Sequence, residues 1–208
     1  MIVWFFVCLF IFIFSTFLHE CGHGLSNKIN GVSVSTGFNR VGNAYAFPNN
    51  NNFRTGFEET QSFLLDFGVP LTLLLAVLFT LLLYRKKELK SWGGIIVAGF
   101  ALCNSIIRLV PCVIVVMNSF LTGSLHMEDE VQTGQLLVEQ TGVSWLLFIP
   151  LIISITISLI CFILSIKRCK KIEYLKFRGM WTCFWVAYIV SFIIENYLDT
   201  IIRINWIA

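Results

Sequence analysis

Residues 2–23 read IVWFFVCLFIFIFSTFLHECGH, and this stretch decides the class of fold. It is almost wholly apolar as far as Phe14, and about 20 such residues are enough to cross a bilayer core of roughly 30 Å. No Lys or Arg precedes it and no small-residue cleavage site follows it, so we expect a retained span rather than a signal peptide. Its last residues are titratable, and titratable side chains in membrane helices are costly and usually functional.

The composition of the whole chain also indicates that a bilayer is its solvent. Of 208 residues, 57% are hydrophobic and 13% are charged, whereas soluble domains are about a quarter charged. This balance argues against a water-soluble globule, a nucleic-acid binder and a disordered regulator. Further apolar runs cover 63–84, 92–121, 144–166 and 180–200. We therefore expect an all-α polytopic membrane protein, a single membrane domain over 1–208 with about five transmembrane helices.

Positive charges predict how the spans are oriented. Lys and Arg are concentrated in the loops after the second and fourth spans, while residues 122–143 contain acids but no Lys or Arg. Because basic loops stay on the cytoplasmic side, this pattern predicts an integral protein of the cell membrane with its N-terminus inside and its C-terminus outside. The loop at 24–62 would then lie outside, although it contains three basic residues.

Two local features modify this picture of plain spans. Residues 31–47 alternate in the manner of a β-hairpin, with Val32, Val34 and Phe38 at even positions and glycines where the chain would turn. The third span is longer than a bilayer requires and contains Pro111, which predicts a kink or a break. We therefore expect a small β-hairpin after the first helix and a kink or a break in the third helix.

The first span ends in His19-Glu20-Cys21-Gly22-His23, an HExxH motif. On a helix, residues four apart share a face, so both imidazoles can bind one Zn²⁺. Glu20 is then left free to act as a general base. The alternative is a surface helix end that happens to carry two histidines.

A catalytic zinc site needs a third protein ligand and an open position for water. The candidates in this chain are Asp129, Glu128, Glu130, Asp66, Glu195 and His126. At 1.5 Å per helical residue, the polar side chains of four spans lie about 18–27 Å from the inner span ends, which brings them to one depth near the outer boundary. These side chains are His19, Asp66, Asn104, Arg108 and Glu195.

Charge pairing narrows the choice of third ligand. Arg108 either acts directly in the site or neutralises the charge of Asp66 or Glu195. Glu195 could instead be a residue of the outer membrane interface. We expect Arg108 to pair with Asp66, which leaves the acidic cluster 128–130, unless that cluster is a solvated loop. A short outer helix starting there would point Asp129 inward while its two acidic neighbours face elsewhere.

These residues resemble the site-2-protease family of intramembrane zinc metalloproteases, over roughly residues 5–130. His19 to Gly24 matches that family's first motif, and 31–47 resembles the hairpin that follows it. Gly68-Val69-Pro70-Leu71 resembles its Gly-Pro-Leu element, with one Val inserted. Asn104, Leu109 and Pro111 resemble its third motif, in which an Asp is the third ligand. By this resemblance that Asp is Asp129, across a longer insertion than usual.

The function that follows is a zinc metalloprotease hydrolysing peptide bonds of membrane or membrane-adjacent proteins. His19, His23 and Asp129 would bind Zn²⁺, Glu20 would transfer the proton, and Asn104 would donate a hydrogen bond to the oxyanion or the substrate backbone. The supporting residues would be Asp66, Arg108, Gly68 and Pro70. The partners would be a membrane protein or peptide substrate and the lipid bilayer, without nucleic acid. The alternative is a non-catalytic zinc-binding membrane accessory protein, which zinc held by four protein groups would favour.

Overall fold

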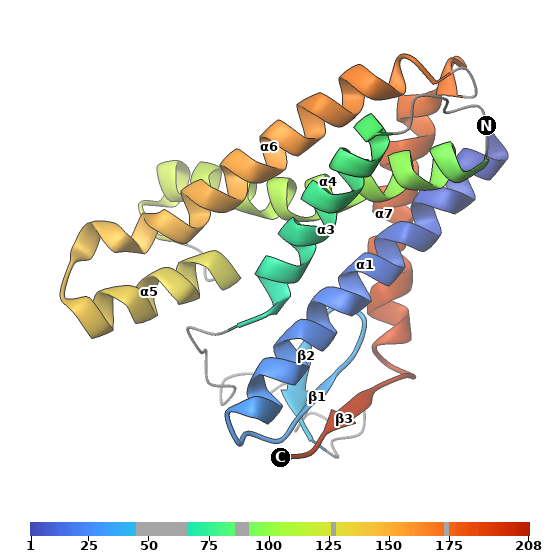
Figure 1. Ribbon diagram of the computed structural model, residues 1–208. Coiled ribbons are helices and arrows are strands. Elements are labelled where there is room, and N and C mark those ends of the chain that lie inside the picture. Colours follow the sequence, from blue (N-terminus) through green and yellow to red (C-terminus); the bar gives the residue numbers. More distant parts are fainter. Residues whose placement is uncertain (45–65, 86–91, 126–127, 173–174) are drawn as a thin grey trace.

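A computed structural model describes residues 1–44, 66–85, 92–125, 128–172 and 175–208. Its helices are α1 (Ile2–Ile29), α3 (Gly68–Arg85), α4 (Trp92–Thr122), α5 (Asp129–Thr141), α6 (Ile149–Cys169) and α7 (Met180–Leu198), with a 3₁₀ turn η1 (Ser144–Phe148) before α6. Its strands are β1 (Val34–Thr36), β2 (Val41–Asn43) and β3 (Ile204–Trp206). Within these ranges five helices are long and apolar enough to cross a membrane, namely all except α5. The expected class, a multi-pass helical membrane protein with a small sheet, is confirmed (Figure 1).

The bounds of the spans differ from the expected ones in ways that matter for the site. α1 continues to Ile29, so the HExxH motif lies inside the helix instead of ending it. α4 continues through Pro111, so the expected break is wrong, because a proline removes one backbone hydrogen bond and the flanking turns keep theirs. Residues 63–65 of the predicted second span lie outside the described residues. α7 ends at Leu198, two residues before the expected end of the span, and the chain beyond it leads into β3.

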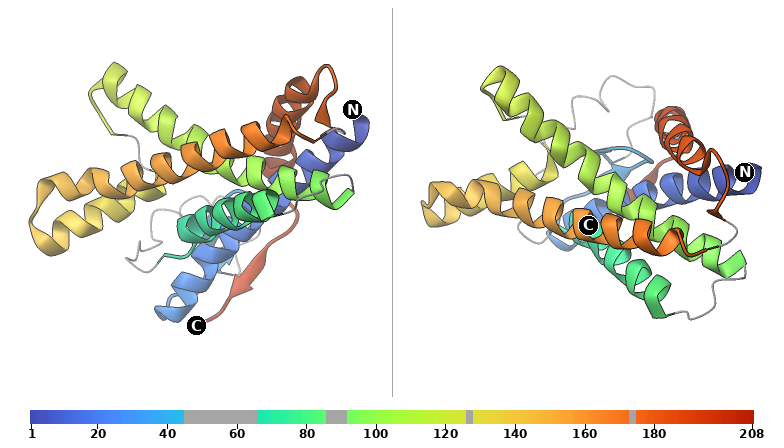
Figure 2. Two further views of the ribbon diagram at one scale, coloured as in Figure 1. Left: turned by 45° about the horizontal axis from the view of Figure 1, so that its top comes forward. Right: turned by 90° about the horizontal axis from the view of Figure 1, so that it is seen from above.

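The helices form one bundle in which α1 packs against α7, α4 and α3, while α4 packs against α3 and α6 (Figure 1). The start of α1 lies beside the start of α7, where Trp4 Nε1 donates a hydrogen bond to the Met180 carbonyl oxygen (3.2 Å). The end of α3 lies beside the end of α6, where Arg168 Nε donates to the Leu83 carbonyl oxygen (3.1 Å). Figure 2 shows α5 folded back beside α6. Because α5 and α6 lie side by side, the N-terminus of α5 lies next to α4, on the same side of the bundle as the sheet.

The sheet is attached to the second half of α1. β1 is its central strand and pairs antiparallel with β2 on one side and with β3 on the other. The expected hairpin is confirmed by β1 and β2, although its last predicted residues, 45–47, lie outside the described chain. β3 adds a strand that we did not expect. Trp206 of β3 donates its indole N–H to the Thr36 hydroxyl (2.8 Å) and lies over Gly24, where a Cβ would come within 2.3 Å of the ring.

Candidate metal centre

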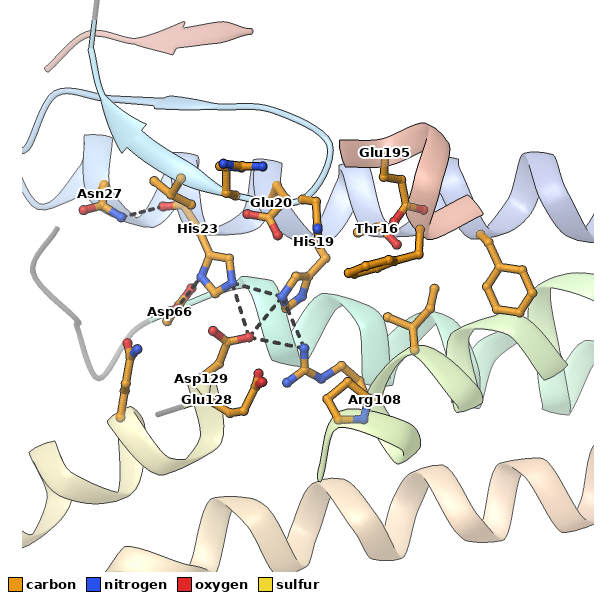
Figure 3. A pocket seen from close by; sticks show the side chains of 18 of the residues that line it. Thr16, His19, Glu20, His23, Asn27, Asp66, Arg108, Glu128, Asp129 and Glu195 are labelled. Carbon is orange, nitrogen blue, oxygen red and sulfur yellow. Dashed lines mark hydrogen bonds and ion pairs between the residues drawn. The ribbon is translucent and has the colours of Figure 1, made fainter. Parts of the chain in front are cut away.

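Three donor atoms from α1 and α5 converge on one point (Figure 3). His19 Nε2 lies 3.0 Å from His23 Nε2 and 3.1 Å from Asp129 Oδ2, and His23 Nε2 lies 3.6 Å from the same carboxylate oxygen. Zinc bonds of 2.0–2.2 Å in a tetrahedron place neighbouring donor atoms about 3.3–3.5 Å apart. The three distances bracket this value, so the donors fit three corners of one zinc tetrahedron.

Hydrogen bonds on the far side of each ring determine which nitrogen faces this point. His23 Nδ1 lies 2.7 and 2.8 Å from the two carboxylate oxygens of Asp66. His19 Nδ1 lies 3.1 Å from the Thr72 hydroxyl, which donates its own proton to the Gly68 carbonyl oxygen and therefore accepts from the ring. Both imidazoles thus carry a proton on Nδ1 and direct a lone pair from Nε2 toward the common point. Such outer partners orient histidine ligands in metal sites and raise their basicity.

The two aspartates of the centre are held in the ionised state. Burial on its own would raise the pKa of Asp66, but the hydrogen bond from His23 Nδ1 outweighs burial and lowers it. Burial likewise opposes ionisation of Asp129, yet the neighbouring His23 and His19 rings and the Arg108 guanidinium hold its pKa well below the usual range. Asp66 and Asp129 therefore both carry a negative charge at neutral pH.

Arg108 does not pair with Asp66, and this expectation was wrong. Its Nε and Nη2 donate to the two oxygens of Glu130 (3.1 and 2.5 Å), and Nη1 donates to Asp129 Oδ2 (3.2 Å) and to His19 Nε2 (3.3 Å). Glu130, which we expected to face elsewhere, is 1% exposed inside this ion pair. The reason is geometric. α5 begins at Asp129 against α4, and a guanidinium fork is wide enough to contact two successive acids of a first helical turn.

Glu20 is close to the ligands without belonging to their cluster. It is 7% exposed, and it lines the same cavity as His19 and His23. No hydrogen bond or ion pair joins it to a residue that the structure describes. A carboxylate in this position is available to accept a proton, as a general base must be.

A cavity of about 860 Å³ gives access to the three ligands. α1 lines it with residues three or four apart, which lie on one helical face. These are Phe12, Thr16, His19, Glu20, His23 and Asn27. The other walls come from α4, α5, α7 and the start of β2. Its volume is typical of a ligand pocket and is large enough for several residues of a peptide.

The remaining predicted residues lie in different places. Glu128 and Glu195 line the cavity. Asn104 does not line it, because it is fully buried and its Nδ2 donates to the Phe100 carbonyl oxygen (2.9 Å) one turn earlier. Pro70 is exposed in the first turn of α3, where a missing backbone N–H costs nothing. His126 lies outside the described residues.

Gly68 has a clear structural role at the centre. A Cβ at this position would come within 2.5 Å of the His23 ring, so only glycine lets the start of α3 approach α1 this closely. The sequence analysis missed two residues that support the centre. Thr72 accepts a hydrogen bond from His19, and the Ser26 hydroxyl accepts one from the Phe67 N–H (2.8 Å). The only available signal was a polar residue inside or just beyond an apolar run.

No family model, no curated protein and no solved structure matches this chain. The donor chemistry is therefore the guide to what the site holds. Two neutral imidazoles and one carboxylate form a common donor set for zinc in hydrolases, and the same set also holds Fe²⁺ in some oxygenases. A glutamate next to the ligands on the same helix favours zinc and hydrolysis.

Proposed function

We propose that this protein is an intramembrane zinc metalloprotease that hydrolyses peptide bonds of membrane or membrane-adjacent proteins. The observation that carries the proposal is the donor triangle of His19, His23 and Asp129 at the wall of a cavity, beside Glu20, which pairs with no described residue. Three protein ligands leave a fourth position for water, which is typical of catalytic zinc, whereas structural zinc has four protein ligands. Within the described residues no fourth side chain joins the cluster, and this favours the enzyme over a non-catalytic accessory protein.

The residues of the chain divide the chemistry among them. Bound zinc polarises the scissile carbonyl and lowers the pKa of water toward 7. Glu20 accepts the proton of the attacking water and delivers it to the leaving amine. Arg108, which lines the cavity and is fixed by Glu130, stabilises negative charge that develops on the substrate. This assignment replaces Asn104, whose amide is engaged within its own helix.

The substrate has to be extended at the cleavage point, because the carbonyl groups of a helix are engaged in hydrogen bonds. β1 is paired on both sides, so within the described sheet β2 is the outer strand that borders the cavity. Val41, the first residue of this strand, and Arg40 just before it line the cavity. An extended peptide that adds to β2 as a further strand would run past the metal ligands, with backbone hydrogen bonds providing much of its affinity.

The distribution of charge suggests that the site opens to the outside of the cell. Arg85 and the basic residues 167–171 lie at the end of the bundle opposite the sheet and the site, and basic ends stay in the cytoplasm. Single cysteines in a cysteine-free background test this. An impermeant thiol reagent applied to intact cells should label Lys28→Cys and not Lys170→Cys, both of which are exposed. The reverse pattern would place the site on the cytoplasmic side.

The test of function compares Glu20→Gln with Glu139→Gln, an exposed acid at the rim of the same cavity. Wild-type protein purified in detergent should contain zinc and cleave a co-expressed set of single-span reporter proteins. Glu20→Gln should keep the zinc and lose cleavage, because it removes the base and no ligand, while Glu139→Gln should keep both. Loss of metal from Glu20→Gln, or unchanged cleavage by it, would contradict the proposal. Iron in place of zinc would favour redox chemistry.

A further inference from the structure

The cavity that contains the metal ligands is also lined by residues of α1 and α7, and we call this part of it the side pocket. Its polar lining is contributed by Thr16, Tyr188, Ser191 and Glu195. Phe12 and Phe192 line it with aromatic rings. The Glu195 side chain extends from α7 toward Thr16 of α1 (Figure 3). Glu195 is 3% exposed, and its Oε1 has no hydrogen-bond partner among the described residues.

Thr16 and Ser191 form hydrogen bonds with Glu195 but carry no charge. A buried carboxylate without a countercharge is strongly unfavourable, and in a membrane helix such a residue usually marks a ligand site. Among the residues that the structure describes, two arginines line the cavity, and both are engaged elsewhere. Arg108 is held by Glu130 and Asp129. Arg40 donates from Nε to Asp199 (2.8 Å). Within the described parts of the chain, no ion pair is formed by Glu195, and a cationic ligand in the cavity would supply the positive charge that complements it.

We propose that Glu195 binds the cationic side chain of a Lys or Arg residue of the substrate, and so determines which peptide is cleaved. This inference rests on the proposed protease function. Thr16, which lines the pocket, precedes Glu20 by one helical turn, about 6 Å along α1. An extended peptide advances about 3.3 Å per residue, so the pocket receives a side chain about two residues from the scissile bond.

The shape and chemistry of the pocket suit Lys and Arg in particular. Their aliphatic stems pack against apolar surface while the charged head reaches a polar group. Phe12 and Phe192 provide the apolar walls, and Glu195 with Ser191 provides the polar end. An acidic side chain would instead meet Glu195 and the acids near the ligands, which repel it. A neutral donor would leave the carboxylate charge uncompensated.

A binding experiment tests the pocket independently of cleavage. The probes are single-span peptides of one apolar host sequence with one guest residue, Lys, Arg or norleucine, at successive positions near the outer boundary. Norleucine matches the Lys stem without its charge. Affinity is measured by energy transfer in nanodiscs, using zinc-loaded Glu20→Gln protein. At one position Lys should bind about tenfold more tightly than norleucine, and adding Glu195→Gln should reduce this ratio to within about twofold.

Two further variants separate specificity from general effects. Glu139→Gln removes an equal charge at the exposed rim and should leave the ratio unchanged. Glu195→Asp withdraws the carboxylate by one methylene and should shift the preference from Lys to the longer Arg, which keeps the inference testable if the Gln variant folds poorly.

The possible results distinguish the pocket from the protease. Equal Lys-to-norleucine ratios with and without Glu195→Gln would overturn the assignment of Glu195. If the ratio depends on Glu195 while wild-type protein cleaves none of the peptides, the cationic pocket stands and the protease function fails. If wild-type protein cleaves Lys and norleucine peptides equally well at every position, the protease stands and the pocket is refuted.

Discussion

Replacing Asp66 by Asn tests whether the outer partner of a histidine ligand controls metal affinity. The substitution keeps the shape of the side chain and removes its charge. Changes of this kind cost about 10–100-fold in metal affinity. The upper end is expected here, because both oxygens of the charged Asp66 carboxylate lie within 2.7–2.8 Å of His23 Nδ1. We therefore expect a loss of about 100-fold, or about 2.7 kcal/mol of binding free energy.

The equivalent contact on the other histidine provides an internal scale. His19 Nδ1 donates to the neutral Thr72 hydroxyl at 3.1 Å, and neutral hydrogen bonds are about half as strong as charge-assisted ones. Thr72→Val should therefore weaken zinc binding by about tenfold. Thr80→Val is the matched control, because it makes the same change in α3 where the hydroxyl contacts Ser165 instead of a histidine.

Zinc dissociation constants from competition with a chromophoric chelator, in detergent at neutral pH, provide the measurement. Thermal unfolding in the presence of excess chelator shows whether each variant is folded. Wild-type affinity in Asp66→Asn, or a smaller loss than in Thr72→Val, would refute the reasoning. Complete loss of zinc from folded Asp66→Asn would make Asp66 a ligand instead of a partner to one.

Two more substitutions test the neighbouring acids. Asp129→Ala should lose zinc and cleavage by metal analysis and reporter assay, while Glu128→Ala, its chain neighbour, should keep both; retention of zinc by Asp129→Ala would remove it from the ligand set. Arg108→Gln leaves the buried Glu130 without a countercharge and should cost about 3–5 kcal/mol of stability. Adding Glu130→Gln should restore most of the loss in thermal unfolding, and an additive effect of the pair would contradict the ion pair.

Axial positions along the helices could be predicted from the sequence because helical rise is constant. The expected common depth brought His19, Asp66 and Arg108 to one region, where the structure places them. How far the cavity extends along α4 was not predictable in the same way. Asn104 lies one turn before Arg108 on the same helical face, yet it is fully buried and its amide donates to its own helix, because the packing of neighbouring helices determines where along α4 the cavity ends.

Partner choice among charges was the least predictable feature. Asp66 and Arg108 lie at similar depths, and pairing them would neutralise both. The structure instead gives Arg108 to Glu130, because α5 begins at Asp129 and rotates successive acids by about 100°. Acids are favourable in the first turn of a helix, where the helix dipole is positive. The sequence before α5 has no hydrophobic periodicity from which the first residue of this helix, and so the directions of its acids, could have been predicted.

This pairing has an electrostatic consequence for the centre. Asp66, Asp129 and Glu130 bring three carboxylates together, and Arg108 supplies the single positive charge among these four side chains. Both histidines direct lone pairs toward the same point as an Asp129 oxygen, which is repulsive without a cation. A divalent ion at that point would neutralise the two remaining negative charges and accept all three lone pairs. The net charge of these four side chains is the same for either pairing of Arg108, but Asp129 lies beside both histidine lone pairs, and a doubly charged ion at that point would balance the charge and bind all three donors.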